Sequence, residues 1–150
     1  TYWPEEMSGG AESLALAGSG KWANYSFAGH FHFISGSIHP DEGGIILYFR
    51  YKNSKNHYSF HFCFSKKRVE MWKRFKGEWS MAGEVAGYSF TVRHPYFFTV
   101  SSEDDTHTCY MGNEPVLQCM DADIRSGCVG LAAKYCSAGF SDITVTGRVG

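Results

Sequence analysis

The chain has 150 residues, 43% of them hydrophobic, and a formal net charge of −1 at pH 7. This length is enough for one hydrophobic core and too short for two ordinary domains, so we expect a single domain. A nearly neutral domain lacks the basic field of a nucleic-acid-binding protein, and no apolar run approaches the roughly 20 residues that a membrane helix needs. We therefore expect neither a nucleic-acid partner nor a membrane span.

Composition and periodicity favour short strands. Aromatic residues make up 17% of the chain, which also contains 17 glycines, and this mixture is typical of strands and turns rather than long helices. Apolar and polar residues alternate with period two between polar turns, as in a β-sandwich or barrel. The predicted strands cover residues 13–17, 24–33, 45–51, 57–64, 68–75, 78–85, 88–92, 96–101, 106–111, 115–120, 127–134 and 139–146. A short helical turn is expected near 121–126.

The strands 45–51 and 57–64 each have one apolar line of side chains. Apolar residues occupy the odd positions of the first strand and the even positions of the second. Residues directly opposite each other in an antiparallel pair share a face, so the two apolar lines meet only if odd positions pair with even ones. This register puts Leu47, Phe49, Phe60 and Phe62 in the core. It puts Tyr48, Arg50, His57, Ser59 and His61 on the opposite face.

Two further strands alternate in the same way. The outward residues are Glu70, Trp72 and Arg74 in 68–75, and Asn24, Ser26, His30 and His32 in 24–33. If these strands are neighbours of the first two, the outward side chains form one surface. Such a surface suits sugars, whose hydroxyls bind planar charged groups and whose apolar ring faces lie on Trp or Tyr. The alternative, which stays open here, is an ordinary solvated sheet face with stabilising aromatic pairs.

Local charge and cysteine content are less informative. Six cationic residues fall between 66 and 76, and we interpret them as a solvated strand face and turn. The five cysteines, an odd number, match no CxxC metal pattern. At least one thiol must therefore be free. The start of the chain, TYWPEEMSGG, has neither an initiator Met nor a signal-peptide pattern, and we expect a module of a longer protein.

Three segments resemble a known family. GGIILYFRYKNSKNHYSFHF (43–62) resembles the "G-x-x-F-R-Y, polar loop, Y-x-x" segment of concanavalin A-like jelly rolls, in particular family 66 carbohydrate-binding modules and the related 3-keto-disaccharide hydrolase domains. KRVEMWKRFKGEWSMAG (67–83) is similar to their next hairpin. TCYMGNEPVLQCMDADIRSGCVGLAAKYCSAGFSDITV (108–145) is similar to their C-terminal half. The matches span about residues 22 to 146 and are individually loose, but they occur in the family's order and spacing.

The resemblance implies an all-β fold, a jelly-roll β-sandwich of two antiparallel sheets of the concanavalin A-like lectin/glucanase type. It also implies a non-catalytic module that binds a polysaccharide, such as a β-fructan, and is linked to a catalytic domain in a secreted bacterial glycosidase. We accordingly expect an extracellular or cell-surface location, and a monomer. Two departures concern the ligand and a turn: Asn53 replaces a loop Asp, and Met111-Gly112 replaces Asp-Gly. The first weakens the inference of fructose specificity.

The ligand is expected across the sheet face or at its loop rim. Rim candidates are Asp41, Glu42, Asn53, Asn56 and His57, beside Arg50 and Tyr58, although Tyr58 points inward in the predicted register. The predicted ligand-binding residues are Arg50, Trp72, Tyr48, Glu42, Asn53, His57, Tyr58, Glu70 and His61.

Other functions stay open. Retaining glycosidases of this fold usually carry E-x-D-x-x-E on one strand; this string is absent, and Glu70 and Glu84 stand alone. The resemblance to 3-keto-disaccharide hydrolase domains nevertheless leaves a glycoside-cleaving enzyme of that type as an alternative. A laminin G-like interaction domain is compatible with the fold, and four histidines of the outward set suggest a zinc alternative (His30, His32, His57 and His61). No cofactor is required, but Asp142, with Glu5 or Glu6, is a candidate ligand of a structural Ca²⁺. Equally, Asp142 suits a bulge in the last strand.

Overall fold

The computed structural model describes residues 6–8, 13–37 and 43–147, and within these residues it contains twelve β-strands and no helix. None of the described segments therefore forms a helix able to cross a bilayer. The strands are β1 (Glu6–Ser8), β2 (Ser13–Ala17), β3 (Tyr25–Phe33), β4 (Gly44–Asn53), β5 (Asn56–Cys63), β6 (Arg68–Phe75), β7 (Glu78–Ala86), β8 (Tyr96–Glu103), β9 (Thr106–Met111), β10 (Glu114–Met120), β11 (Cys128–Lys134) and β12 (Ser137–Gly147).

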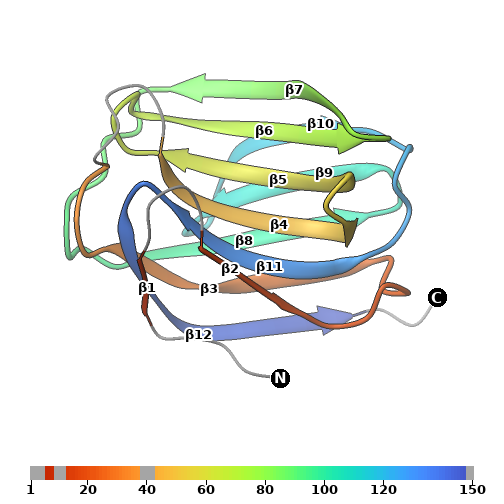
Figure 1. Cartoon of the computed structure of the whole chain (residues 1–150), viewed down its shortest axis with the longest axis horizontal. Helices are drawn as coiled ribbons and strands as arrows, with labels where there is room; N and C mark the ends of the chain where they lie inside the picture. Colours follow the sequence, from red (N-terminus) through yellow and green to blue (C-terminus); the bar gives the residue numbers. More distant parts are fainter. Residues whose placement is uncertain (1–5, 9–12, 38–42, 148–150) are drawn as a thin grey trace.

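The strands form two six-stranded antiparallel sheets that pack face to face (Figure 1). We call the sheet with the order β2-β11-β4-β5-β6-β7 the front sheet, and the sheet with the order β1-β12-β3-β8-β9-β10 the back sheet. Each side of the sandwich is thus one continuous sheet whose inner face meets the other. The predicted all-β jelly-roll sandwich is confirmed.

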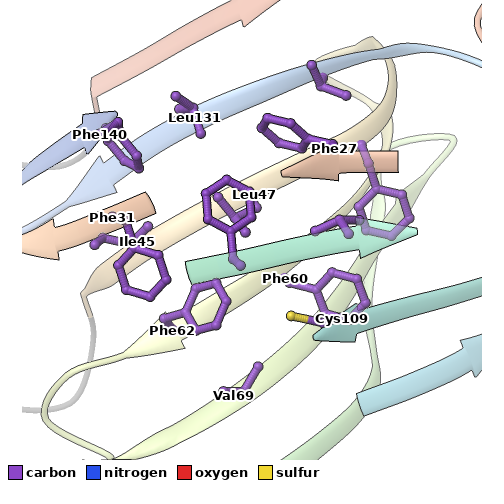
Figure 2. Close-up of a cluster of buried hydrophobic side chains, with 14 of the residues drawn as sticks. Phe27, Phe31, Ile45, Leu47, Phe60, Phe62, Val69, Cys109, Leu131 and Phe140 are labelled. Atoms are coloured by element: carbon purple, nitrogen blue, oxygen red, sulfur yellow. The ribbon is translucent and has the colours of Figure 1, made fainter. Parts of the chain in front are cut away.

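The core lies between the two inner faces and is rich in phenylalanine. Side chains of β3 alternate strictly between buried and half-buried, as expected for a strand with one face on the core. Figure 2 shows Phe27 and Phe31 of the back sheet facing Leu47, Phe60 and Phe62 of the front sheet. The ring centroids of Phe31 and Phe62 are 4.7 Å apart. Burying one such ring stabilises the fold by about 1.5–3 kcal/mol, so this cluster fixes how the two sheets face each other.

Eleven of the twelve predicted strands are present, each within two residues of its predicted bounds. The predicted strand 88–92 is wrong, because residues 87–95 cross from β7 to β8 and so pass between the sheets. The apolar residues in this segment serve the core instead, because Phe90 is buried against Phe33 and Phe62. The short strand β1 was not predicted, and residues 121–126 form a loop instead of a helical turn.

The predicted register of β4 and β5 is confirmed. Leu47 lies opposite Phe60, and Tyr48 lies opposite Ser59, so odd positions pair with even positions. The pairing places Leu47 and Phe60 in the core and leaves Tyr48 and Ser59 on the outer face of the front sheet. Residues 24–33 would share this outer face only if they neighboured β4 to β6, and this condition is not met, because β3 pairs with β12 and β8 in the back sheet.

All five cysteines lie in the described residues, and each thiol is free. Burial raises the pKa of Cys63 to about 12 and that of Cys136 to about 11. It also raises the pKa of Cys109, which is completely buried. These thiols are therefore protonated at neutral pH, and they pack as small apolar side chains.

Candidate functional site

The outer face of the front sheet brings several predicted residues together in rows. Strand pairing sets Ile46, His61 and Glu70 side by side across β4, β5 and β6. The next row along the strands contains Tyr48, Ser59 and Trp72. The face predicted from the alternation of β4, β5 and β6 is thus present.

A hollow of about 290 Å³ lies on this face. Its lining combines indole rings, backbone, an imidazole, a carboxylate and two ammonium groups. The lining residues are Gly43, Gly44, Ile46, His61, Phe62, Cys63, Lys66, Glu70, Trp72, Trp79 and Lys134. Mixed apolar walls with a few polar groups are the usual character of a small-molecule site.

Glu70 is the carboxylate that lines the hollow. It is 4% exposed, and its carboxylate accepts hydrogen bonds from Trp72 Nε1 at 2.9 Å and from Arg68 Nε. Arg68 also pairs with Glu84 at 3.3 Å. Burial raises the pKa of Glu70, but the hydrogen bond from Trp72 and the charge of Arg68 outweigh it, so this pKa lies below its ordinary value. Glu70 is therefore an ionised acceptor that also fixes the orientation of the Trp72 indole.

His61 is a neutral group in the same hollow. Burial lowers its pKa to about 3, against the opposing effect of the Glu70 charge. One ring nitrogen, Nε2, lies 2.8 Å from Ser59 Oγ. A neutral imidazole both donates and accepts hydrogen bonds, which matches the mixed donor and acceptor character of a hydroxyl group.

Trp79 forms the exposed wall of the hollow and was not among the predicted site residues. Trp79 is 49% exposed, and its ring meets the Trp72 ring edge to face, with the two ring centroids 6.3 Å apart. The guanidinium carbon of Arg74 lies 5.2 Å from the Trp79 ring centroid. The signal for Trp79 was present in the sequence, since pairing β6 with β7 sets it opposite the outward Arg74.

His57 and Tyr48 lie on the predicted outer face, but neighbouring side chains cover them. They are 3% and 4% exposed, respectively. The His57 ring stacks on Tyr51 at 5.1 Å and meets the edges of Tyr48 and Trp79 at 5.0 and 5.3 Å. Burial, helped by the charge of Arg74, lowers the pKa of His57 to about 4. These rings support Trp79 from below.

Arg50 does not lie on the outer face, and this part of the prediction is wrong. The register of β4 shifts between Phe49 and Asn53, and Arg50 has a φ of 45°. This bulge reverses the alternation, so that Tyr51 packs beside Tyr48 on the outer face instead. The ligand-binding role assigned to Arg50 loses its geometric basis.

The Arg50 side chain, 1% exposed, instead joins three segments of the chain. Its guanidinium donates to the carbonyl of Ala23 at 3.0 and 3.2 Å and to that of Ile124 at 3.1 Å. Its backbone N–H donates to the Tyr25 hydroxyl at 2.6 Å. Arg50 therefore anchors the segments before β3 and after β10 to the end of β4.

The remaining rim candidates are dispersed. Tyr58 is completely buried, as its register predicted, and its hydroxyl donates to Asp121 Oδ1 at 2.5 Å. Asn53 is exposed, and its Oδ1 accepts hydrogen bonds from the Lys55 backbone and the Asn56 amide within the β4–β5 turn. Glu42, with its neighbour at position 41, lies outside the described residues. Ligand contacts by Asn53 and Glu42 stay predictions.

The metal hypotheses find little support in the described residues. His30 and His32 belong to the back sheet, away from His57 and His61, and the described residues contain no cluster of three metal-ligating side chains. Asp142, which is largely exposed, lies at a register shift of β12 with a φ of 55°, 3.3 Å from His30 Nδ1. One carboxylate does not supply the several oxygens that Ca²⁺ prefers. The calcium site stays a prediction, because Glu5 is outside the described residues.

Several solved structures share this architecture. The carbohydrate-binding module CBM66 from Bacillus subtilis superposes with a TM-score of 0.77 at 20% identity, over 93% of this chain and 84% of that chain. The fold is a concanavalin A-like jelly roll. Sheep galectin-11 (TM-score 0.66, 12% identity) matches over 93% of this chain and all of its own. The GH43 protein BlXynB from Bacillus licheniformis (TM-score 0.60, 14% identity) matches over 85% of this chain and 28% of its own. No protein-family model matches the sequence, and no curated protein matches it either.

Proposed function

We propose that this chain is a carbohydrate-binding module that holds a glycan on the outer face of the front sheet, in the hollow beside Trp72 and Trp79. The observation that carries the proposal is the combination of these two indoles with Glu70, His61 and Lys66 in one hollow. Sugar rings have apolar faces that lie on aromatic rings, and their hydroxyls bind charged and neutral polar groups. The fold supports the proposal, because carbohydrate-binding modules and galectins share it.

Each side chain has a defined part in this binding. The exposed indole of Trp79 stacks against one face of a sugar ring, and Glu70 accepts a hydrogen bond from a hydroxyl. Because Glu70 already holds Trp72 and Arg68 in place, little side-chain freedom is lost when the glycan binds, which favours affinity. An open hollow of this kind gives weak binding, in the micromolar to millimolar range.

The proposal extends to the role of the module. We infer that it is a non-catalytic, extracellular monomer that directs a linked glycoside-active domain to a polysaccharide, a β-fructan or another plant or microbial glycan. The match to part of the longer BlXynB chain supports such a linkage. The state of Glu70 argues against one catalytic role, that of a general acid. A glycosidase's general acid needs a raised pKa, whereas the pKa of Glu70 is lowered.

The test is a panel of plant, microbial and host glycans presented to the purified chain. We expect one glycan class to bind, and Trp79→Ala to abolish binding while the folded state persists by circular dichroism. Phe97→Ala is the matched control, since Phe97 is an aromatic residue of similar exposure, 41%, on the outer face of the back sheet. Equal binding by wild type and Trp79→Ala would refute the site. Turnover of an aryl glycoside would favour an enzyme instead.

A further inference from the structure

Charged residues are segregated between the two sheets. Residues 44–86, which form β4 to β7, include nine Lys or Arg and three Glu. Residues 96–123, which form β8 to β10 and part of the next loop, include six acidic residues and no Lys or Arg. The first group belongs to the front sheet and the second to the back sheet. The near-neutral net charge of the whole chain therefore conceals a positively charged front sheet. Residues 44–86 have six more cationic than acidic side chains, and this excess is still four when Asp41 and Glu42 are included.

Some of the front-sheet cations are neutralised or buried. Lys73 pairs with Asp121 and Asp123, and Arg68 pairs with Glu70 and Glu84. Arg50 is buried at the end of β4. Lys52 donates a hydrogen bond to Ser126 of the 121–127 loop at 3.2 Å. Three cations at the β4–β5 and β6–β7 turns differ, because no carboxylate of the described residues pairs with them. We call this group the cationic rim: Lys55, Arg74 and Lys76.

The two turns that carry the cationic rim are joined to each other. The N–H of Gly77 donates to the carbonyl of Lys55 at 3.1 Å, and that of Lys76 donates to Asn56 Oδ1 at 2.9 Å. Arg74 reaches across to the carbonyl of Ser54 at 2.8 Å. Hydrogen bonds between the two turns thus hold the like charges of the rim near one another. Glu78, at the start of β7, is the carboxylate of the same turn, and an anionic ligand would reduce the repulsion between the rim cations.

The cationic rim adjoins the proposed sugar site through Trp79. Arg74 lies over the Trp79 ring, and the same indole lines the hollow. Lys66 lines the hollow as well, on the turn at the other end of β6. A glycan stacked on Trp79 therefore has a cation on either side of it along β6.

We propose that the glycan of the front sheet is acidic, with carboxylate or sulfate groups that contact the cationic rim. This inference rests on the proposed function, since it names the class of sugar that the same face binds. Each exposed ion contact strengthens binding by roughly 1.5- to 5-fold. Because these contacts are exposed, they weaken with ionic strength, and the affinity falls as salt rises.

The test compares matched polysaccharides on the full chain. Polygalacturonate and dextran sulfate are the acidic probes, dextran and levan the neutral ones, and single-stranded DNA is a non-sugar polyanion. The variant Lys55→Gln/Lys76→Gln removes two rim charges. The control Lys21→Gln/Lys67→Gln removes two exposed charges outside the rim. Lys67 and Lys76 both have a positive φ, 55° and 53°, so each double variant places one Gln in a left-handed backbone conformation.

We expect an acidic polysaccharide to bind more tightly than every neutral one, and its affinity to fall between about 0.05 M and 0.3 M salt. The rim variant should lose roughly 2- to 30-fold in affinity, and the control should keep wild-type affinity. If a neutral glycan binds at Trp79 and acidic ones bind no better, the inference is wrong while the proposed function stands. If no glycan binds, the proposed function fails. Equal binding of single-stranded DNA, with the same loss in the rim variant, would mean that the rim selects charge alone and would overturn the assignment to a glycan.

Discussion

Arg50 gives a quantitative test of the fold at the end of β4. We predict that Arg50→Met, which retains a long side chain but no donors, destabilises the chain without directly affecting the sugar face. The change removes the donors of two backbone carbonyls, those of Ala23 and Ile124. A buried acceptor left without a donor costs about 1–3 kcal/mol.

The two carbonyls do not contribute equally to the loss of stability. The Ile124 contact is buried, whereas the Ala23 contact is partly buried and can exchange its donor for water. Removing a buried charge also recovers part of its desolvation energy. The expected net loss in the free energy of unfolding is therefore about 2–4 kcal/mol, which for a chain of this size lowers Tm by roughly 5–15 °C.

Urea denaturation followed by tryptophan fluorescence measures this loss. Arg125→Met is the control, because Arg125 is an exposed arginine of the 121–127 loop, and we expect it to change stability by no more than about 0.5 kcal/mol. Two results would refute the reasoning. One is a loss below about 1 kcal/mol for Arg50→Met. The other is a folded Arg50→Met protein whose glycan affinity falls as far as that of Trp79→Ala.

Three further predictions concern stability and reactivity. Burial lowers the pKa values of His57 and His107 to about 4 and that of His61 to about 3, so the unfolded chain binds more protons than the folded chain below pH 6.5. The free energy of unfolding should therefore fall by about 2 kcal/mol per histidine from pH 7.5 to 5; a flat urea midpoint over this range would contradict it. Gly44→Ala places a Cβ 2.0 Å from the carbonyl oxygen of Phe62 and should cost at least about 2 kcal/mol in a thermal melt. Iodoacetamide at pH 8 should label Cys109 and Cys136 only in denaturant, since both are buried with raised pKa values; rapid labelling of the native chain would count against the packing.

Alternation within single strands was enough to predict the core and the local register. Leu47 and Phe60 had to meet because a one-residue slip would expose both apolar lines, and they do meet. The same alternation in β3 shows which residues point inward but not which sheet they belong to. Its partners β8 and β12 are distant in sequence, and no local pattern identifies them. For this reason the alternation alone leaves open whether His30 and His32 share a surface with His57 and His61.

Arg50 shows where single-strand patterns fail. A left-handed residue at a bulge is usually a glycine, so nothing in the sequence marked Arg50 as the point where alternation reverses. Its carbonyl partners, at Ala23 and Ile124, become neighbours only in the folded chain. Trp79, by contrast, was within reach of sequence reasoning, because the tight turn between β6 and β7 sets it opposite Arg74.

The central claim is that a glycan binds beside Trp72 and Trp79, and the indole N–H resonances test it most directly. In a titration of the ¹⁵N-labelled chain with the glycan selected from the panel, we predict progressive shifts of the Trp72 and Trp79 indole signals. Trp22, which lies outside the hollow and packs against Tyr25, should stay unchanged and acts as the internal control. Shifts confined to Trp22, or to backbone amides of the back sheet, would contradict the account.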